Sequence, residues 1–166
     1  FPTRRSSDLQ TCLLLEHVAD QTKNEFVEKL LNYLPLLYLK ARILKIPEQI
    51  LDGYLQTIVE EEDYVFVEQG VKQLLGTDDA YLEVFMEDMK FSDEPITAFI
   101  SENLADIYQE LKNMAFNYHQ QQEAVMSDGV LACLEAFREH WSQKLLNVLR
   151  ALNALWLSDD FQERDE

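Results

Sequence analysis

Hydrophobic residues recur every three to four positions along most of the chain, which is the period of an amphipathic helix. The division is clearest over 128–157, where one arc of the predicted helix is apolar and the opposite arc is polar or charged. The apolar arc holds Val130, Leu134, Phe137, Trp141, Leu145, Val148, Leu152 and Leu155. Residues 101–125, with Ser101 as the predicted cap, show the same division. No stretch alternates convincingly with the two-residue period of a strand, so the pattern predicts an all-α fold.

A long helix over 22–45 is predicted by its first residues and by its composition. Thr22 and Glu25 have the spacing of a capping box, in which each side chain accepts a hydrogen bond from the other residue's backbone N–H. The helix that follows is apolar nearly all round, which is typical of a helix buried at the centre of a fold. Pro35 lacks the N–H that a regular helix needs, so we expect a kink there or two abutting helices.

Shorter elements complete the predicted bundle. Residues 47–57 are expected to form a short helix broken at Gly53. Residues 60–75 form a longer helix whose acidic first turn suits the positive end of the helix dipole, and Gly76 suits the position after its end. A further short helix is predicted over 77–89. Together these elements predict a single compact bundle of about six helices, not a regular four-helix bundle.

The two ends of the chain are expected to differ from the middle. Residues 1–9, FPTRRSSDL, read as the in-frame translation of a sequencing adapter, a non-biological scar, so we expect them to make few tertiary contacts. Residues 10–157 form the predicted single helical domain, which begins with a helix over 10–19. The tail, 158–166, is acidic and is expected to fray.

Composition and charge narrow the class of protein. The 166 residues are 47% hydrophobic, too many for a disordered chain, and their net charge of −17 argues against a nucleic-acid partner. The longest apolar run, 33–39, is far shorter than the ~20 residues of a membrane span, so no membrane association is expected. Cys12 and Cys133 have no disulfide or metal-binding spacing and are interpreted as reduced thiols of a cytoplasmic protein.

Three carboxylates are the strongest chemical feature of the sequence. Glu102, Asp106 and Glu110 follow one another at four-residue steps, opposite the apolar arc of 101–125, so we expect an acidic face in contact with solvent. Two alternatives stay open. Carboxylates that project into a helical bundle can hold metal ions, and a buried Asp106 paired with Arg150 would fix how two helices pack. No metal motif of recognised spacing is present.

Five runs of residues, spread in order over most of the chain, carry a resemblance to a known family. The runs are LPLLYLKA at 34–41, DAYLEVF at 79–85, DMKFSD at 88–93, SENLADIYQ at 101–109 and HWSQKLLNVLRAL at 140–152. Together they resemble an uncharacterised bacterial family, the domain of unknown function 5063. Ser142 and Asn153 depart from its pattern, where glycine and histidine are expected. The resemblance implies a compact helical fold in a bacterial protein, and it carries over no activity and no catalytic residue.

These observations favour a non-enzymatic module of a bacterial cytoplasmic protein that binds a protein partner through an acidic surface or an apolar groove. The alternative is a metal-dependent helical enzyme that gathers carboxylates from several helices, and convergence of three or more carboxylates would favour it. No cofactor is expected, and no catalytic, cofactor-binding or metal-ligating residue is assigned. The interaction or structural candidates are Asp106, Tyr108, Trp141, Asn147 and Arg150, of which Trp141 is expected to be buried against helices 22–45 and 101–125.

Overall fold

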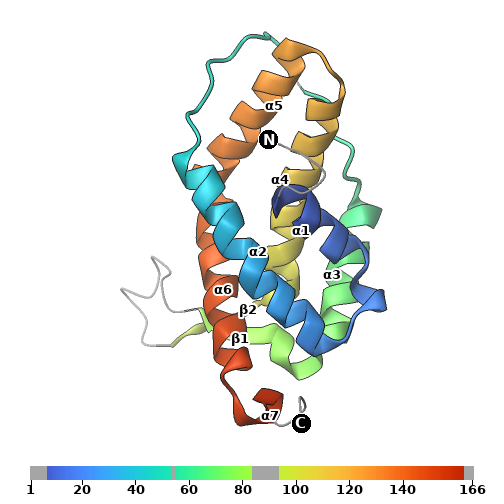
Figure 1. Ribbon diagram of the computed structural model, residues 1–166, viewed down its shortest axis with the longest axis vertical. Helices are drawn as coiled ribbons and strands as arrows, with labels where there is room; N and C mark the ends of the chain where they lie inside the picture. Colours follow the sequence, from blue (N-terminus) through green and yellow to red (C-terminus); the bar gives the residue numbers. More distant parts are fainter. Residues whose placement is uncertain (1–6, 54, 84–93, 163–166) are drawn as a thin grey trace.

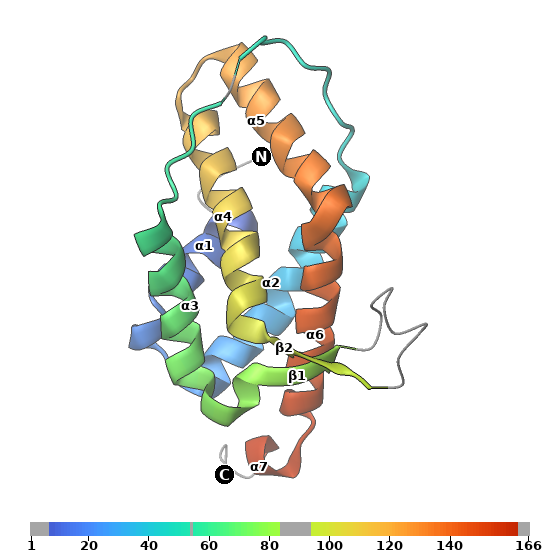
Figure 2. The ribbon, with the colours of Figure 1, turned by 180° about the vertical axis from the view of Figure 1, so that it is seen from behind.

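The computed structural model describes residues 7–53, 55–83 and 94–162, which form a bundle of helices with one small hairpin (Figures 1 and 2). The helices are α1 (Ser7–Glu16), α2 (Lys23–Ile43), α3 (Glu61–Leu75), α4 (Ile100–His119), α5 (Glu123–Ala136), α6 (Ser142–Trp156) and the single turn α7 (Asp159–Gln162). The prediction of an all-α bundle of about six helices is confirmed. In the described part of the chain, no helix is both long enough and apolar enough to traverse a bilayer.

The core lies around α4, which packs against α1, α3, α5 and α6. In Figure 2, α4 runs along the middle of the molecule between α3 and α6. Its predicted apolar arc is buried, with Leu104, Ile107 and Leu111 almost fully enclosed. Gly129 lets α5 approach closely, because a Cβ atom there would lie 2.9 Å from the Cβ atom of Asn117. The central helix of the fold is therefore α4.

α2 starts as predicted but does not occupy the centre. Thr22 Oγ1 accepts a hydrogen bond from the backbone N–H of Glu25 at 3.2 Å, and Glu25 Oε2 accepts one from that of Thr22 at 3.0 Å. The helix is a single element through Pro35, not two. The prediction that α2 is buried all round is wrong: its inner side packs on the core, whereas Leu39 and Ile43 on its outer side are 54% and 70% exposed.

The chain between α4 and α6 differs from the predicted boundaries. α4 ends at His119, Gln121 takes a positive φ of 59°, and α5 begins at Glu123. The single helix predicted over 128–157 is instead α5 and α6 joined by a π-helical turn, Phe137–Trp141. Such a turn accommodates an extra residue without breaking the helix.

Trp141 anchors the core at that turn, as predicted. Its side chain is 1% exposed, and Nε1 donates a hydrogen bond to the carbonyl of Cys133 at 3.0 Å. Its ring lies edge-on to Phe137, with the centroids 4.5 Å apart, and Phe137 in turn meets Tyr38 of α2 at 5.5 Å. These aromatic contacts connect the π-helical turn to α2.

Residues 47–57, predicted as a short helix, are not helical in their described part. Two of their backbone N–H groups are satisfied by a side chain from another element. Those of Ile50 and Leu51 donate to the Asp128 carboxylate of α5 at 2.9 and 2.8 Å. Beyond this segment, Asn113 of α4 accepts hydrogen bonds from the backbone N–H groups of Ile58 and Val59, just before α3 begins. These tertiary hydrogen bonds hold the connection extended across the end of the bundle.

The helix predicted over 77–89 is also absent from its described part. α3 ends at Leu75, and Gly76, with a positive φ of 59°, takes the position after the helix as predicted. A short 3₁₀ turn follows, and strand β1 (Ala80–Glu83) then pairs antiparallel with β2 (Ile96–Phe99). Residues 84–89, which include the rest of the predicted helix, lie outside the described residues.

Asp79 explains why the chain turns at this point. Its carboxylate is buried and accepts hydrogen bonds from the backbone N–H of Ser101 at 2.7 Å and from the Ser101 hydroxyl at 2.6 Å. Asp79 therefore caps α4 from another part of the chain. Ser101, predicted as the cap, lies in the first turn of α4 and donates to the capping group.

Both ends of the described chain are more firmly packed than predicted. Ser7 and Asp8 belong to the first turn of α1 and are buried, in contrast to the few contacts expected for 1–9. Phe161 of α7 is 3% exposed, so the predicted acidic tail is attached to the core at that residue. Residues 1–6 and 163–166 lie outside the described residues.

Candidate functional site

The outer face of α4 carries a polar cluster in which Asp106 is the central acceptor. Tyr64 of α3 donates its hydroxyl to Asp106 Oδ1 at 2.8 Å, and Lys144 of α6 donates its ammonium to Oδ2 at 2.6 Å. The fully exposed position predicted for Asp106 is therefore wrong: contacts from two neighbouring helices leave 29% of its side chain exposed. Asp106 forms an ion pair with Lys144, whereas the sequence suggested Arg150.

The cluster continues along α4 to Glu110, which lies 3.5 Å from Nε2 of His140. Burial raises the pKa of Glu110 above its usual value, and the negative charge of Asp106 adds to this effect, while His140 and Lys144 oppose it. Burial and the hydrogen bond to Asp106 likewise raise the pKa of the Tyr64 hydroxyl. Glu102, one turn earlier, is exposed.

These groups are arranged as pairs that connect helices. Asp106 joins α3 and α6 to α4, and Glu110 joins the π-helical turn to α4. Among residues 7–53, 55–83 and 94–162, no group of three or more His, Cys, Asp and Glu side chains is placed to hold a metal ion. The cluster thus fits a structural role, in which charged hydrogen bonds set the packing of three helices.

Tyr108 and Asn147 have similar positions at other helix contacts. Tyr108 donates its hydroxyl to Glu16 of α1 at 2.9 Å, and Lys112 donates to the same carboxylate at 2.6 Å. Asn147 of α6 donates to Glu83 of β1 at 2.8 Å. Each side chain connects two elements of the fold.

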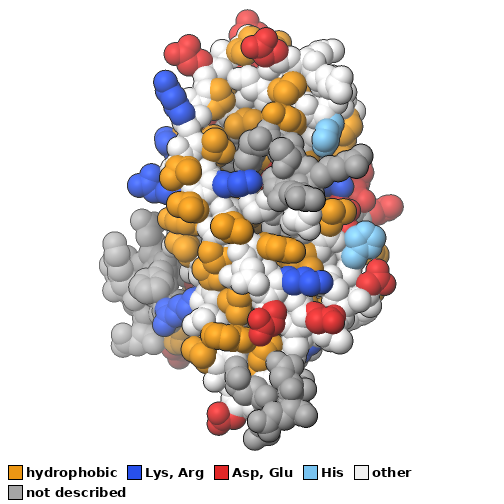
Figure 3. Space-filling model, viewed as in Figure 1, with side chains coloured by type: hydrophobic (Ala, Val, Ile, Leu, Met, Phe, Trp, Pro, Cys, Tyr) orange, Lys and Arg blue, Asp and Glu red, His pale blue; other side chains and the backbone are white. Residues whose placement is uncertain are grey.

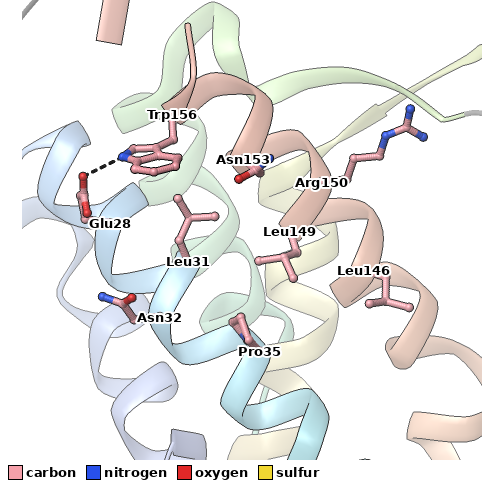
Figure 4. A pocket seen from close by; sticks show the side chains of 9 residues that line it. All are labelled: Glu28, Leu31, Asn32, Pro35, Leu146, Leu149, Arg150, Asn153 and Trp156. Carbon is pink, nitrogen blue, oxygen red and sulfur yellow. Dashed lines mark hydrogen bonds between the residues drawn. The ribbon is translucent and has the colours of Figure 1, made fainter. Parts of the chain in front are cut away.

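Arg150, the remaining candidate from the sequence, lies beside a groove between α2 and α6. The groove has a volume of about 570 Å³, and its mainly apolar lining includes Leu31, Pro35, Leu146, Leu149 and Trp156. Figure 4 shows Leu149 pointing from α6 toward α2, while the Arg150 guanidinium points away from the space between the helices. At one end, Trp156 Nε1 donates to Glu28 Oε1 at 2.9 Å. We call this feature the α2–α6 groove.

Exposed hydrophobic residues extend the groove along α2 and α6. Leu36, Leu39 and Ile43 follow Pro35 on α2, and Leu146 of α6 is 44% exposed. Figure 3 shows hydrophobic side chains gathered over this face, with Lys and Arg among them, while Asp and Glu lie mostly toward its ends and right-hand edge. The sequence carried a signal for this surface, since α2 has more apolar positions than one buried side requires.

The fold and the groove define this chain as a compact all-α domain. The chain belongs to the family described as Domain of unknown function (DUF5063), whose model matches residues 7–158. Its structure is similar to the crystal structure of protein BF1032 from Bacteroides fragilis, with 35% sequence identity and a TM-score of 0.82 over 92% of this chain and 89% of that one. A comparison with curated proteins found no match. The family resemblance seen in the sequence is confirmed, and the fold is shared over nearly the whole chain.

Proposed function

We propose that this chain is a protein-interaction module that binds an apolar segment of a partner protein in the α2–α6 groove. The observation that carries the proposal is the continuous apolar surface formed by the groove and by Leu36, Leu39 and Ile43 beside it. Contiguous apolar surface of this kind is uncommon on a soluble monomer and is typical of binding sites. A groove between two helices suits the apolar face of a third helix.

The proposed role is non-enzymatic, and the protein is proposed to act in the bacterial cytoplasm. The polar groups that chemistry would need lie elsewhere: Asp106 and Glu110 are engaged with Lys144 and His140 on the outer face of α4. The groove is lined by leucine, proline and tryptophan side chains together with Glu28, Asn32, Arg150 and Asn153. Glu28 is engaged with Trp156, and the Arg150 guanidinium points away from the groove. A metal-dependent enzyme, the alternative suggested by the sequence, has no comparable observation in its favour.

A displayed library of helical peptides, unbiased in charge, tests the proposal. Peptides are selected on the wild-type protein and then compared on Leu146→Asp, which places a charge in the groove, and on Phe66→Asp. Phe66 is an exposed apolar residue of α3, so this variant controls for the added charge. We expect selected peptides to bind wild type and Phe66→Asp alike and to lose at least about tenfold in affinity on Leu146→Asp, which corresponds to about 1.4 kcal/mol.

Circular dichroism and thermal unfolding establish that both variants fold, and Leu39→Asp provides a second groove variant. Absence of any enriched peptide would contradict the proposal. So would peptides that bind the folded groove variants as tightly as wild type, because they would have selected another surface.

A further inference from the structure

We infer that the partner segment bound by the α2–α6 groove is an acidic amphipathic helix. The inference rests on the proposed function and adds to it the charge and shape of the occupant. It comes from the contrast between the charge of this face and the charge of the whole chain.

The two helices that form the groove are basic in a strongly acidic protein. α2 and α6 contain six Lys and Arg residues against two Glu residues, and α6 contains no acidic residue, whereas the whole chain has a net charge of −17. Lys23 and Lys144 pair with Asp78 and Asp106 on other elements. Of the other four, Lys40 and Arg42 lie in the last turn of α2, beside Leu39 and Ile43. Lys29 borders a hollow on the α1 side of α2, and the Arg150 guanidinium points away from the groove, whose lining also contains Glu28. The positive charge of this face is therefore concentrated at the end of α2. An acidic partner is attracted to this face and repelled by the remaining surface, which directs it to the groove.

The shape of the apolar surface indicates a helix of a few turns. From Leu31 to Ile43 the apolar residues extend along thirteen residues of α2, a length of about 18 Å at the rise of an α-helix. Leu146 and Leu149 of α6 border the same surface. A partner helix with apolar residues at i, i+3, i+4 and i+7 matches this surface, and acidic residues on its flanks meet the Lys and Arg side chains.

Charge also argues against a second copy of the chain as the occupant. A symmetric dimer through this face would bring the same basic helices of both copies together, since a twofold interface uses one patch twice. Like charges facing one another at an interface are unfavourable. An acidic segment of a different protein has no such repulsion.

Two designed helical peptides of about sixteen residues test the inference. Both carry the same leucines at i, i+3, i+4 and i+7; one has glutamate and the other lysine at the flanking positions. Binding is measured by the anisotropy of a fluorophore on each peptide. We expect the glutamate peptide to bind at least about tenfold more tightly at low salt, and the difference to shrink in about 1 M salt, where the screening length falls to about 3 Å.

A pair of charge variants locates the effect on this face. Arg42→Gln removes a positive charge beside Ile43 on α2, and Lys72→Gln removes one from the exposed surface of α3. We expect Arg42→Gln to weaken the glutamate peptide severalfold and Lys72→Gln to leave its affinity unchanged. Equal effects of the two variants would overturn the inference, because net charge alone would then explain binding.

The remaining outcomes separate this inference from the proposed function. Equal affinity for both peptides, tighter binding of the lysine peptide or binding of neither overturns the acidic partner; groove-specific peptides from the unbiased library would still support the groove as a binding site. Tight binding to phosphatidylserine vesicles without binding of the glutamate peptide would reassign the face to an anionic membrane. A dimer in analytical ultracentrifugation that Leu146→Asp dissociates would make a second copy the occupant.

Discussion

The outer face of α4 and the outer face of α2 reverse what their sequence patterns suggest. Along α4, Asp106 and Glu110 lie on the polar side of a clearly divided helix, yet both are partly enclosed by neighbours. Tyr64 of α3 and Lys144 of α6 contact Asp106, and His140 of the π-helical turn contacts Glu110. Along α2, Leu36, Leu39 and Ile43 make the helix apolar nearly all round, yet no element in the described residues encloses them. The polar face of α4 is partly enclosed by its neighbours, and the apolar face of α2 is exposed.

The difference shows what helical periodicity can and cannot determine. It divides a helix into sides, but it does not say how many neighbours the helix has. α4 has neighbours on most sides, so its polar side is used to fix helix packing. α2 lies at the edge of the bundle, so its surplus apolar residues stay on the surface, where we propose that a partner binds.

The largest effect on stability is expected at Trp141, because this residue packs in the core that supports both faces. Trp141→Ala should lower the free energy of unfolding by about 3–5 kcal/mol, because it empties a fully buried site and removes the aromatic contact with Phe137. Urea denaturation measures this change. A loss below about 1 kcal/mol would show that the core lies elsewhere and would break the comparison.

Asp106→Ala tests directly whether the contacts on the polar face of α4 stabilise the fold. The variant leaves the Tyr64 hydroxyl and the Lys144 ammonium without their acceptor, so we expect a loss of about 1–3 kcal/mol in unfolding free energy. Glu102→Ala is the matched control on the same helix, and it should change stability by less than about 0.5 kcal/mol because Glu102 is exposed. Similar small changes in both variants would support the sequence-based expectation that Asp106 faces solvent.

Asp8 sharpens the comparison, because it is a buried carboxylate without the partners that Asp106 has. Its side chain is 1% exposed, and neither oxygen accepts a hydrogen bond within the described residues. Burying an unpaired polar group is unfavourable, so Asp8→Ala should raise the free energy of unfolding by about 1–2 kcal/mol. The sign is opposite to that expected for Asp106→Ala. A loss of stability in chemical denaturation would contradict the prediction and would indicate that the Asp8 carboxylate has a partner.

The sequence predicted those features that depend on neighbouring residues or on one strongly periodic helix. The Thr22 capping box, the end of α3 at Gly76 and the burial of Trp141 are of this kind. The helices predicted over 47–57 and 77–89 are absent from their described parts, where side chains distant in the chain make the decisive contacts: Asp128 binds the backbone of Ile50 and Leu51, and Asp79 binds that of Ser101. Sequence spacing does not contain such contacts. For the same reason it could not show that α2 and α6 border a groove.

Glu110 makes the stability contributed by the polar face of α4 dependent on pH. Its pKa is raised in the folded protein, mainly by burial, so the folded state binds the proton more tightly than the unfolded state. Stability from this group is therefore present at pH below its usual pKa near 4.5 and declines as the pH rises from there through the raised folded value. Glu110→Gln should remove this decline and slightly favour the folded state of the variant near neutral pH. Urea unfolding at a series of pH values measures it, and parallel curves for wild type and variant would contradict it.

The smallest effect is expected on the open face, where Leu39→Gln should change the free energy of unfolding by less than about 0.5 kcal/mol. Leu39 is already half exposed, so a polar side chain there gives up little buried area. Leu37→Gln is the matched control on the same helix: Leu37 is almost fully buried, and placing an amide in the core should cost several times more. Thermal and urea unfolding of the two variants measure the contrast. Nearly equal losses would mean that Leu39 is covered in the protein alone, which would close the α2 face and remove the surface on which the proposed binding site depends.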